Sequence, residues 1–458
     1  MSPAPDASAD TFVELRRYLL AQSALCLRPP VDRFRHPWLS PMPLTQVGAA
    51  YLAARQSGGA EAFEPQLARS QSGDGFQAGD YSLGLFHHDA SEASIELLRH
   101  PELRAGAAGS LLCLLDCASP SGRVHRAELC HKSREAEPSK PVIAQYAANI
   151  AKALGRDAGE WLARHRVMAR VEAFIGFLER EYTGLHGLFL THSSLQSGFD
   201  SDILTAGLPD KSVEGPDTNA FMVLEYEALA GLQRQFGDQA RATEWEEKAF
   251  RLRELMERLL WLEDASGGRY VALRWQHGVG SVEAERVGTR DPEGRVHPFE
   301  SWVSLLPLYA GIPSAPRAEA LMRKVLDPAT YWGPAGLRTT PADDIYFQQA
   351  PRVMLYDHKK LDRGPVSNWS GPVWILSSYY LAAGLARYGR LDAARELTLR
   401  TARLLADGLA RQGALHECYD DQGRGLWPRV GTFISWNVLV LTMLRNWGPE
   451  PVSTPPSV

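Results

Sequence analysis

Cysteine is scarce in this sequence: the 458-residue chain has five cysteines, and they are widely scattered. That excludes a disulfide-stabilised scaffold, and we interpret Cys113 and Cys117 as two thiols buried on one helix face. Long apolar runs are also missing, since no stretch approaches the roughly 20 residues that cross a bilayer. The first ten residues lack a basic start followed by an apolar segment, so no secretory signal is expected. Reduced thiols without such a signal favour the cytoplasm.

Surplus positive charge is absent as well, because 49 Lys and Arg residues face 54 Asp and Glu residues. A basic surface that binds nucleic acid is therefore not expected. Glycine-rich dinucleotide and phosphate loops and the GxSxG nucleophile motif are missing too. No histidine or cysteine shows metal-ligand spacing. These absences predict a protein without cofactor or metal, and they leave its oligomeric state open.

The chain does contain helix periodicity. Apolar residues recur at helical spacing in about twelve segments, among them 157–183, 215–236 and 238–262. Gly237 and Gly389 each follow such a segment, where glycine commonly forms a left-handed cap. Strand signals are few, and residues 267–275 are the best candidate for a hairpin.

Paired antiparallel helices predict an all-α fold, an (α/α)6 toroid with long active-site loops and few short strands. An open α-solenoid is the alternative. No proline- or glycine-rich linker interrupts residues 11–448, so we expect one catalytic domain there. Residues 1–10 and the proline-rich tail at 449–458 are expected to be disordered.

Three regions combine tryptophan, glycine and carboxylates: 192–204, 331–344 with 368–374, and 416–436. Loops of this length are usually functional. Tryptophan faces stack on the apolar faces of sugar rings while carboxylates bind the hydroxyls, although packing is the ordinary role of any single tryptophan. The combination predicts a small carbohydrate substrate. The candidate binding residues that these loops supply are Trp332, Arg338, Trp369, Trp374, Trp427 and Arg429.

Residues 368–374, NWSGPVW, resemble the Tyr-Trp-Arg-Gly-Pro-Val-Trp block of glycoside hydrolase family 63, with departures at Asn368 and Ser370. SGFDSD at 197–202 is similar to the segment that carries the family's general acid, which implies that role for Asp200. HECYDDQGRG at 416–425 is similar to the segment of the general base, which implies that role for Glu417. The resemblance covers roughly residues 30–446. It is strongest to short bacterial members that act on mannosylglycerate or glucosylglycerate, and trehalase family 37 is more distant.

Two further segments carry weaker matches. GPDTN at 215–219 resembles a helix start of the family and implies binding roles for Asp217 and Asn219, although a helix cap is an equal interpretation of both. LFHHDASEA at 85–93 implies a binding role for Asp89, and His87-His88 replace aromatic residues of the family there. The resemblance as a whole implies an inverting, exo-acting α-glycosidase that needs no cofactor.

The chemistry of the two carboxylates agrees with these roles. Glycoside cleavage usually needs one protonated and one ionised carboxyl group across the bond. Asp200 lies between Phe199 and Asp202, and both an apolar neighbour and a second acid raise a carboxyl pKa. Glu417 lies on a glycine-rich loop that can approach a ligand.

Other functions stay open at this point. A trehalase-like hydrolase is the runner-up. A sugar epimerase or isomerase of the same fold is a second class, favoured by the His87-His88 pair, and a carbohydrate-binding toroid without catalysis is a third. Arg338 and Arg429 are the basic residues available to pair with a substrate carboxylate such as glycerate, and a surface salt bridge is an equal interpretation.

Overall fold

The computed structural model describes most of the chain. The described residues are 9–56, 82–130, 137–199, 202–205, 208–265, 267–278, 281–290, 292–293, 296–344, 347, 369–427 and 432–449. The two ends expected to be disordered therefore lie outside the described residues, except for Ala9, Asp10 and Pro449.

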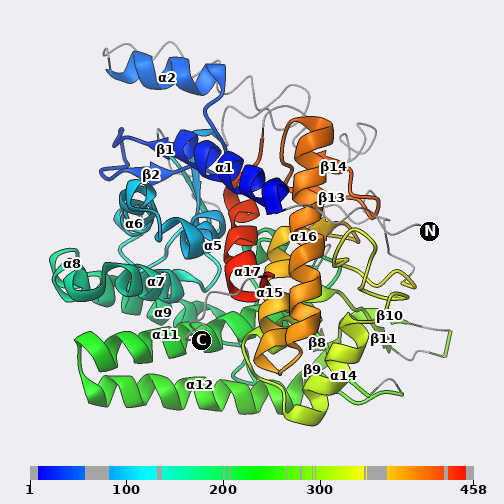
Figure 1. Cartoon of the computed structure of the whole chain (residues 1–458). Helices are drawn as coiled ribbons and strands as arrows, with labels where there is room; N and C mark the ends of the chain where they lie inside the picture. The colour runs from blue at the N-terminus through cyan, green and yellow to red at the C-terminus, as the bar shows by residue number, and fades with distance from the viewer. Residues whose placement is uncertain are drawn as a thin grey trace.

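Helices in the described part of the chain contact one another in a closed inner ring. Figure 1 labels most of these helices. In order around the ring these are α5 (His87–Leu97), α7 (Ile143–Leu154), α11 (Pro216–Phe236), α13 (Leu306–Tyr309), α15 (Ile375–Arg387) and α17 (Leu439–Trp447), and α17 contacts α5 again. An outer set consists of α1 (Ala9–Cys26), α6 (Pro101–Asp116), α9 (Val167–Tyr182), α12 (Gln239–Leu259), α14 (Ala315–Val325) and α16 (Leu391–Gln412). The all-α (α/α)6 toroid predicted from the sequence is confirmed.

Helix α7 shows why these segments become inner helices. Its residues Ile143, Tyr146, Ala147 and Ile150 follow helical spacing, and all four are fully buried. Such a stripe directs one helix face to the core. The Glu225 carboxylate of α11 accepts hydrogen bonds from the first amides of α7, those of residues 144 and 145, and so caps the helix.

Two local predictions about helices need correction. The segment 157–183 is two helices, α8 (Ala158–Arg164) and α9, because Arg166 between them has a left-handed backbone with φ of 50°. Gly389 has the expected left-handed conformation, but Gly237 has φ of −135° and lies against the Gln233 side chain. The remaining short helices are α2 (Gln46–Gln56) and α10 (Ser194–Ser197).

The strands are short and all pair antiparallel. They are β1 (Leu27–Arg28) with β2 (Trp38–Leu39), β3 (Gly84–Phe86) with β4 (Ala127–Leu129), β5 (Val213–Glu214) with β8 (Leu273–Gly278) and β9 (Ser281–Arg286), β6 (Trp261–Leu262) with β7 (Arg269–Tyr270), β10 (Gly288–Arg290) with β11 (Val296–Pro298), and β12 (Val373–Trp374) with β13 (Cys418–Tyr419) and β14 (Gly425–Trp427). The expected hairpin at 267–275 is instead formed by β8 and β9, farther along the chain. Strands β3 and β12 are the most relevant to the candidate site, because each leads directly into an inner helix, α5 and α15 respectively.

Candidate active site

A pocket lies where several inner helices begin. Its lining residues are Phe86, His87, His88, Asp89, Arg126, Gly198, Trp369, Trp374, Glu417 and Trp436. The pocket encloses about 470 Å³ of empty space, a figure that includes space open to solvent. Two carboxylates and three tryptophans thus meet in one pocket, although they come from distant parts of the sequence.

Trp369 and Trp374 form the aromatic wall of the pocket. Their rings stack with centroids 3.7 Å apart and planes 12° apart, and both residues are almost fully buried. Thr339 fixes the turn between them, since its hydroxyl oxygen accepts from the Gly371 amide and donates to the Pro372 carbonyl, each over 3.0 Å. Ring stacking and these two hydrogen bonds hold the wall in one position, and a binding surface needs such support from neighbouring groups.

Glu417 comes from the residue before β13, whose Cys418 pairs with Trp374 of β12. This pairing brings the Glu417 segment beside the aromatic wall. The Trp436 indole N–H donates to the Glu417 carbonyl over 3.4 Å, and the Asn437 amide donates to the His416 carbonyl over 2.8 Å. The Glu417 side chain is 7% exposed where it lines the pocket.

Asp89 lies in the first turn of α5 and is half-buried in the pocket wall. The Ser435 hydroxyl donates to its Oδ1 over 2.7 Å. Helix N-termini favour carboxylates, so the fold holds this charge at the pocket.

The neighbouring histidines are committed to other contacts. His87 Nε2 accepts from the Lys140 amide over 2.9 Å, so the ring proton lies on Nδ1, which donates to the Arg126 carbonyl over 2.6 Å. Burial lowers the pKa of His87 to about 3, and burial also lowers the pKa of His88 well below its usual value. Both rings are neutral, and His87 uses both nitrogens on backbone groups, which disfavours proton transfer by this pair.

Asp217 and Asn219, at the start of α11, do not line the pocket. Asn219 is fully buried, and its side chain hydrogen-bonds both backbone groups of Phe189 and the Gly215 carbonyl, over 2.7 to 3.0 Å. Asp217 is 2% exposed, and burial raises the pKa of its carboxyl group. The side chain of Asn219 therefore holds neighbouring backbone groups, and the binding roles expected for Asp217 and Asn219 stay predictions.

Arg338 is also committed to structure. Its Nε and Nη2 donate to the two carboxylate oxygens of Asp421 over 3.0 and 3.1 Å, and Nη1 donates to the carbonyls of Pro328 and Thr330. Every nitrogen of the Arg338 guanidinium thus has a partner within the protein, which favours the salt-bridge interpretation of this residue; its pairing with a substrate carboxylate stays a prediction.

Trp332 is buried under the Arg400 guanidinium, 5.1 Å from its ring centre, and does not line the pocket. Trp427 ends β14, where its backbone pairs with Cys418. Asp200 and Arg429 lie outside the described residues.

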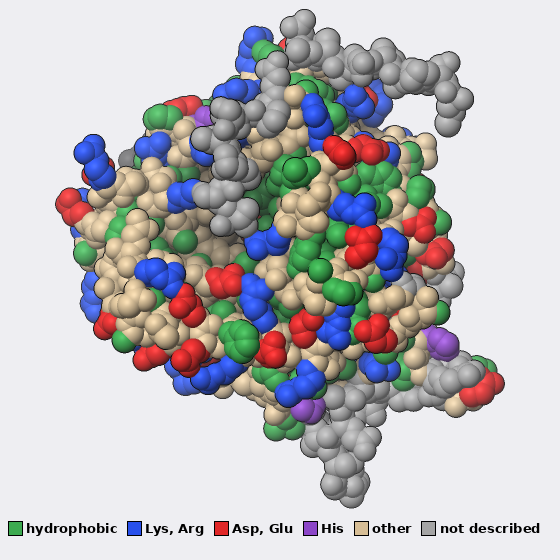
Figure 2. Space-filling view, turned by 60° about the horizontal axis from the view of Figure 1, so that its bottom comes forward, with side chains coloured by type: hydrophobic (Ala, Val, Ile, Leu, Met, Phe, Trp, Pro, Cys, Tyr) green, Lys and Arg blue, Asp and Glu red, His purple; other side chains and the backbone are tan. Residues whose placement is uncertain are grey.

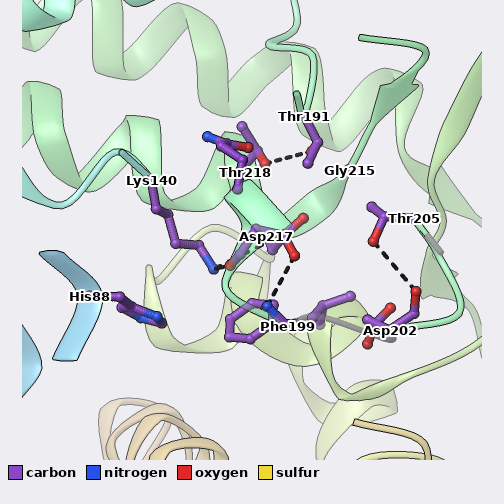
Figure 3. Close-up of polar contacts among 12 residues, drawn as sticks. His88, Lys140, Thr191, Phe199, Asp202, Thr205, Gly215, Asp217 and Thr218 are labelled. Atoms are coloured by element: carbon purple, nitrogen blue, oxygen red, sulfur yellow. Dashed lines mark hydrogen bonds and ion pairs between the residues drawn. The ribbon is translucent and has the colours of Figure 1, made fainter. Parts of the chain in front are cut away.

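Sequence reasoning did not identify a buried cluster of charged residues around Lys140. Lys140 is fully buried, and its ammonium lies 3.8 Å from Asp217 Oδ2, as Figure 3 shows. Burial lowers the pKa of Lys140 to about 7, and Asp217, Glu92 and Asp202 oppose that shift. Burial also raises the pKa values of Glu92 and Asp202 to about 7. The one feature of the sequence that could have indicated this cluster is a lone lysine directly before the apolar face of a helix.

Two wider features bear on partners. Among the described residues, no group of three or more His, Cys, Asp or Glu side chains is arranged to hold a metal ion, and no helix is both long and apolar enough to cross a membrane. On the face drawn in Figure 2, Lys and Arg side chains are interspersed with Asp and Glu.

The family comparison matches the region that builds most of this pocket. A family model described as the mannosylglycerate hydrolase MGH1-like glycoside hydrolase domain matches residues 191–433, slightly more than half of the chain.

Solved structures share the fold at low sequence identity. The GH63 mannosylglycerate hydrolase from Thermus thermophilus in complex with glucose has a TM-score of 0.56 and 18% identity, over 79% of this chain and 92% of that one. The same enzyme in complex with Tris and D-glycerate has a TM-score of 0.56 and 17% identity, over 83% and 98%. The neutral trehalase Nth1 from Saccharomyces cerevisiae has a TM-score of 0.54 and 15% identity, over 79% and 72%.

Proposed function

The chain belongs to the mannosylglycerate hydrolase MGH1-like family of glycoside hydrolases, and we propose that it cleaves a small α-glycoside with inversion at the anomeric carbon. The observation that carries this proposal is one pocket lined by Glu417, Asp89 and the stacked Trp369 and Trp374. A pocket with aromatic and carboxylate walls suits one sugar unit, which supports exo action on a terminal residue.

Glu417 is the proposed general base. Among the residues that the structure describes, it is the glutamate that lines the pocket, and its backbone is fixed by the pairing of Cys418 with Trp374 and by the Trp436 indole. In this role its carboxylate takes a proton from the water that attacks the anomeric carbon. The carbon–oxygen bond to the leaving group then breaks on the opposite face of the sugar.

Asp200 is the proposed general acid, which protonates the departing oxygen. Its assignment rests on the sequence SGFDSD, and its described neighbours support it. Gly198 lines the pocket, while Phe199 is fully buried. An inverting enzyme keeps its two carboxyl groups about 6.5–9.5 Å apart, which leaves room for the water.

The sugar hydroxyls are assigned to Asp89, and the apolar face of the ring is assigned to Trp369 and Trp374. Trp436 is a further candidate that sequence reasoning did not select, since it lines the same pocket. Asp217 is assigned no direct contact with the sugar, since it does not line this pocket and its carboxylate pairs with Lys140.

A glycosyl-glycerate is the proposed substrate class. The matching family model supports this proposal, and so do the structures of the Thermus thermophilus enzyme in complex with glucose and in complex with Tris and D-glycerate. Arg429 is the remaining candidate from the sequence for pairing with the glycerate carboxylate. Trehalose is the alternative, supported by the shared fold of the yeast trehalase. The proposed location is the cytoplasm, as expected from the sequence.

A hydrolysis screen tests the proposal. Purified protein is incubated with mannosylglycerate, glucosylglycerate, trehalose, and simple α-mannosides and α-glucosides, and proton NMR follows the anomeric signals. We expect a glycosyl-glycerate to be the best substrate and the first free sugar to be the β-anomer. A first product in the α-form would exclude inversion, and a preference for trehalose would favour the alternative.

A further inference from the structure

We infer that Lys140 is a positioning residue for the proposed acid: its buried ammonium fixes the segment Ser197–Phe199, which leads directly into Asp200. The inference rests on the proposed function, since it assigns Lys140 a role in the same reaction. Nothing in the sequence motifs selected this lysine.

The Lys140 ammonium contacts that segment, its counter-ion Asp217 and one aromatic ring of α11. The ammonium donates a hydrogen bond to the Ser197 carbonyl and lies 3.3 Å from the centre of the Phe199 ring. It also lies 4.5 Å from the Phe221 ring centre and pairs with Asp217. Cation–π contacts strengthen when both groups are desolvated, and this lysine has no exposed surface.

The segment that the ammonium holds is part of the pocket wall. Gly198 has φ of 74°, a conformation that favours glycine. A Cβ at this position would come within 2.8 Å of His88 Nδ1, so the segment packs tightly on that histidine. The backbone amide of Lys140 meanwhile donates to His87. One residue thus holds two adjoining parts of the wall, through its backbone and through its side chain.

The segment is held on the far side of Asp200 as well. The Asp202 amide donates to the Phe199 carbonyl over 2.8 Å, and the Asp202 carboxylate accepts from the Leu204 amide over 2.9 Å. Asp202 is 2% exposed. Described residues before and after Asp200 in the sequence are therefore held in place, since Phe199 lies against Lys140 and the Asp202 amide is hydrogen-bonded back to Phe199. Figure 3 labels Lys140, Phe199 and Asp202.

A misplaced general acid can be distinguished from general damage to the active site by comparing the rates on two substrates. An alkyl aglycone such as glycerate needs protonation to depart, whereas fluoride leaves without a proton. Loss of the acid therefore slows an alkyl glycoside and spares the α-glycosyl fluoride of the same sugar. A displacement of about 1 Å can lower a rate about 10²-fold, so a misplaced acid produces the same pattern.

The experiment compares Lys140→Met with Asp200→Asn on both substrates. Methionine keeps the apolar stem but donates no hydrogen bond and carries no charge. We expect Lys140→Met to lower kcat on the glycosyl-glycerate at least ten-fold, with KM little changed, and to lower kcat on the fluoride less than about three-fold. Asp217→Asn, which removes the counter-ion, is the second variant if Lys140→Met does not fold, and it should show the same pattern. Lys140→Arg, which restores a cation, should recover part of the loss.

Glu225→Gln is the matched control, because it changes another buried carboxyl group of α11, one that accepts hydrogen bonds from Ala144 and Gln145 of α7. It should leave both rates unchanged. Suppose that Asp200→Asn slows the glycosyl-glycerate and spares the fluoride. The role of Lys140 is then overturned if Lys140→Met lowers both rates equally, raises KM alone or causes no loss. If Asp200→Asn itself fails to discriminate, the assigned acid is wrong, and the proposed function is what fails.

Discussion

Ser435 and Asp89 join the two ends of the inner ring, since the hydroxyl before α17 donates to the carboxylate at the start of α5 over 2.7 Å. The two residues are 346 positions apart in the sequence. The contact therefore exists only when the ring is closed, and it orients a carboxylate that we assign to the sugar.

Ser435→Ala tests this contact. A hydrogen bond to a charged group contributes about 1.5–3 kcal/mol, so kcat/KM on the best substrate should fall about ten-fold or more. Steady-state kinetics measures the effect. Ser94→Ala is the control, because Ser94 is a buried serine of α5 whose hydroxyl donates to the Ser91 carbonyl. An unchanged kcat/KM in Ser435→Ala would show that Asp89 needs no such support.

Glu417→Gln and Asp200→Asn should each abolish nearly all hydrolysis while the fold persists. Each change keeps the side-chain shape but removes the charge or the proton that the reaction uses, and such groups contribute about 10²–10⁴-fold. Turnover and thermal unfolding are measured together. Asp420→Asn is the control on the Glu417 loop, because Asp420 binds its own loop through Arg424 and the Gln422 amide. Retention of more than about a tenth of wild-type turnover would remove the assigned role.

Arg338→Ala should destabilise the protein without altering substrate preference. The change breaks a bidentate pair with Asp421 whose side chains are 9% and 18% exposed, and breaking such a pair costs about 3 kcal/mol. Urea unfolding checks this value. Arg424→Ala, at a largely exposed position of the same loop, should change stability by less than about 0.5 kcal/mol. If Arg338→Ala keeps normal stability but selectively raises KM for charged substrates, the binding role of Arg338 is supported instead.

Arg429→Ala tests the charged aglycone. If its guanidinium pairs with the glycerate carboxylate, KM for a glycosyl-glycerate should rise roughly ten-fold or more, since such a bond contributes about 1.5–3 kcal/mol. KM for trehalose or another neutral glucoside should be spared. Arg126→Ala belongs in the same comparison, because Arg126 lines the pocket. Equal effects of Arg429→Ala on both kinds of substrate would show that Arg429 anchors its loop instead.

The pH dependence of the protein's stability should reveal the raised pKa of the Asp202 carboxyl group. Burial raises the pKa of its carboxyl group from 3.8 to about 7 in the folded protein. Between these two pH values the folded state binds a proton that the unfolded state has lost, so this group makes stability fall as pH rises. The slope is at most about 1.4 kcal/mol per pH unit.

Asp202→Asn should remove that slope, because asparagine does not titrate and its side-chain oxygen can still accept from the Leu204 amide. Denaturant unfolding at several pH values between about 4 and 7 measures it. Asp238→Asn serves as the control, since Asp238 is an exposed helix cap that asparagine replaces well. An identical pH slope in Asp202→Asn and wild type would contradict the buried acid.

The sequence by itself determined the helix pairs and the pocket residues that short motifs carry. Helical spacing is a local property, so residues 215–236 and 238–262 could be identified as α11 and α12. NWSGPVW likewise marked Trp369 and Trp374, and HECYDD marked Glu417, because each motif keeps its residue types at fixed spacing. These residues do line one pocket.

Tertiary structure alone decided what the charged side chains pair with. Arg338 finds Asp421 across 83 residues, and Lys140 finds Asp217 only after α7 and α11 pack together in the ring. No local pattern encodes either contact. The physical reason is that a buried charge is stable only beside a partner, and the partner is whichever group the closed ring brings within a few ångströms.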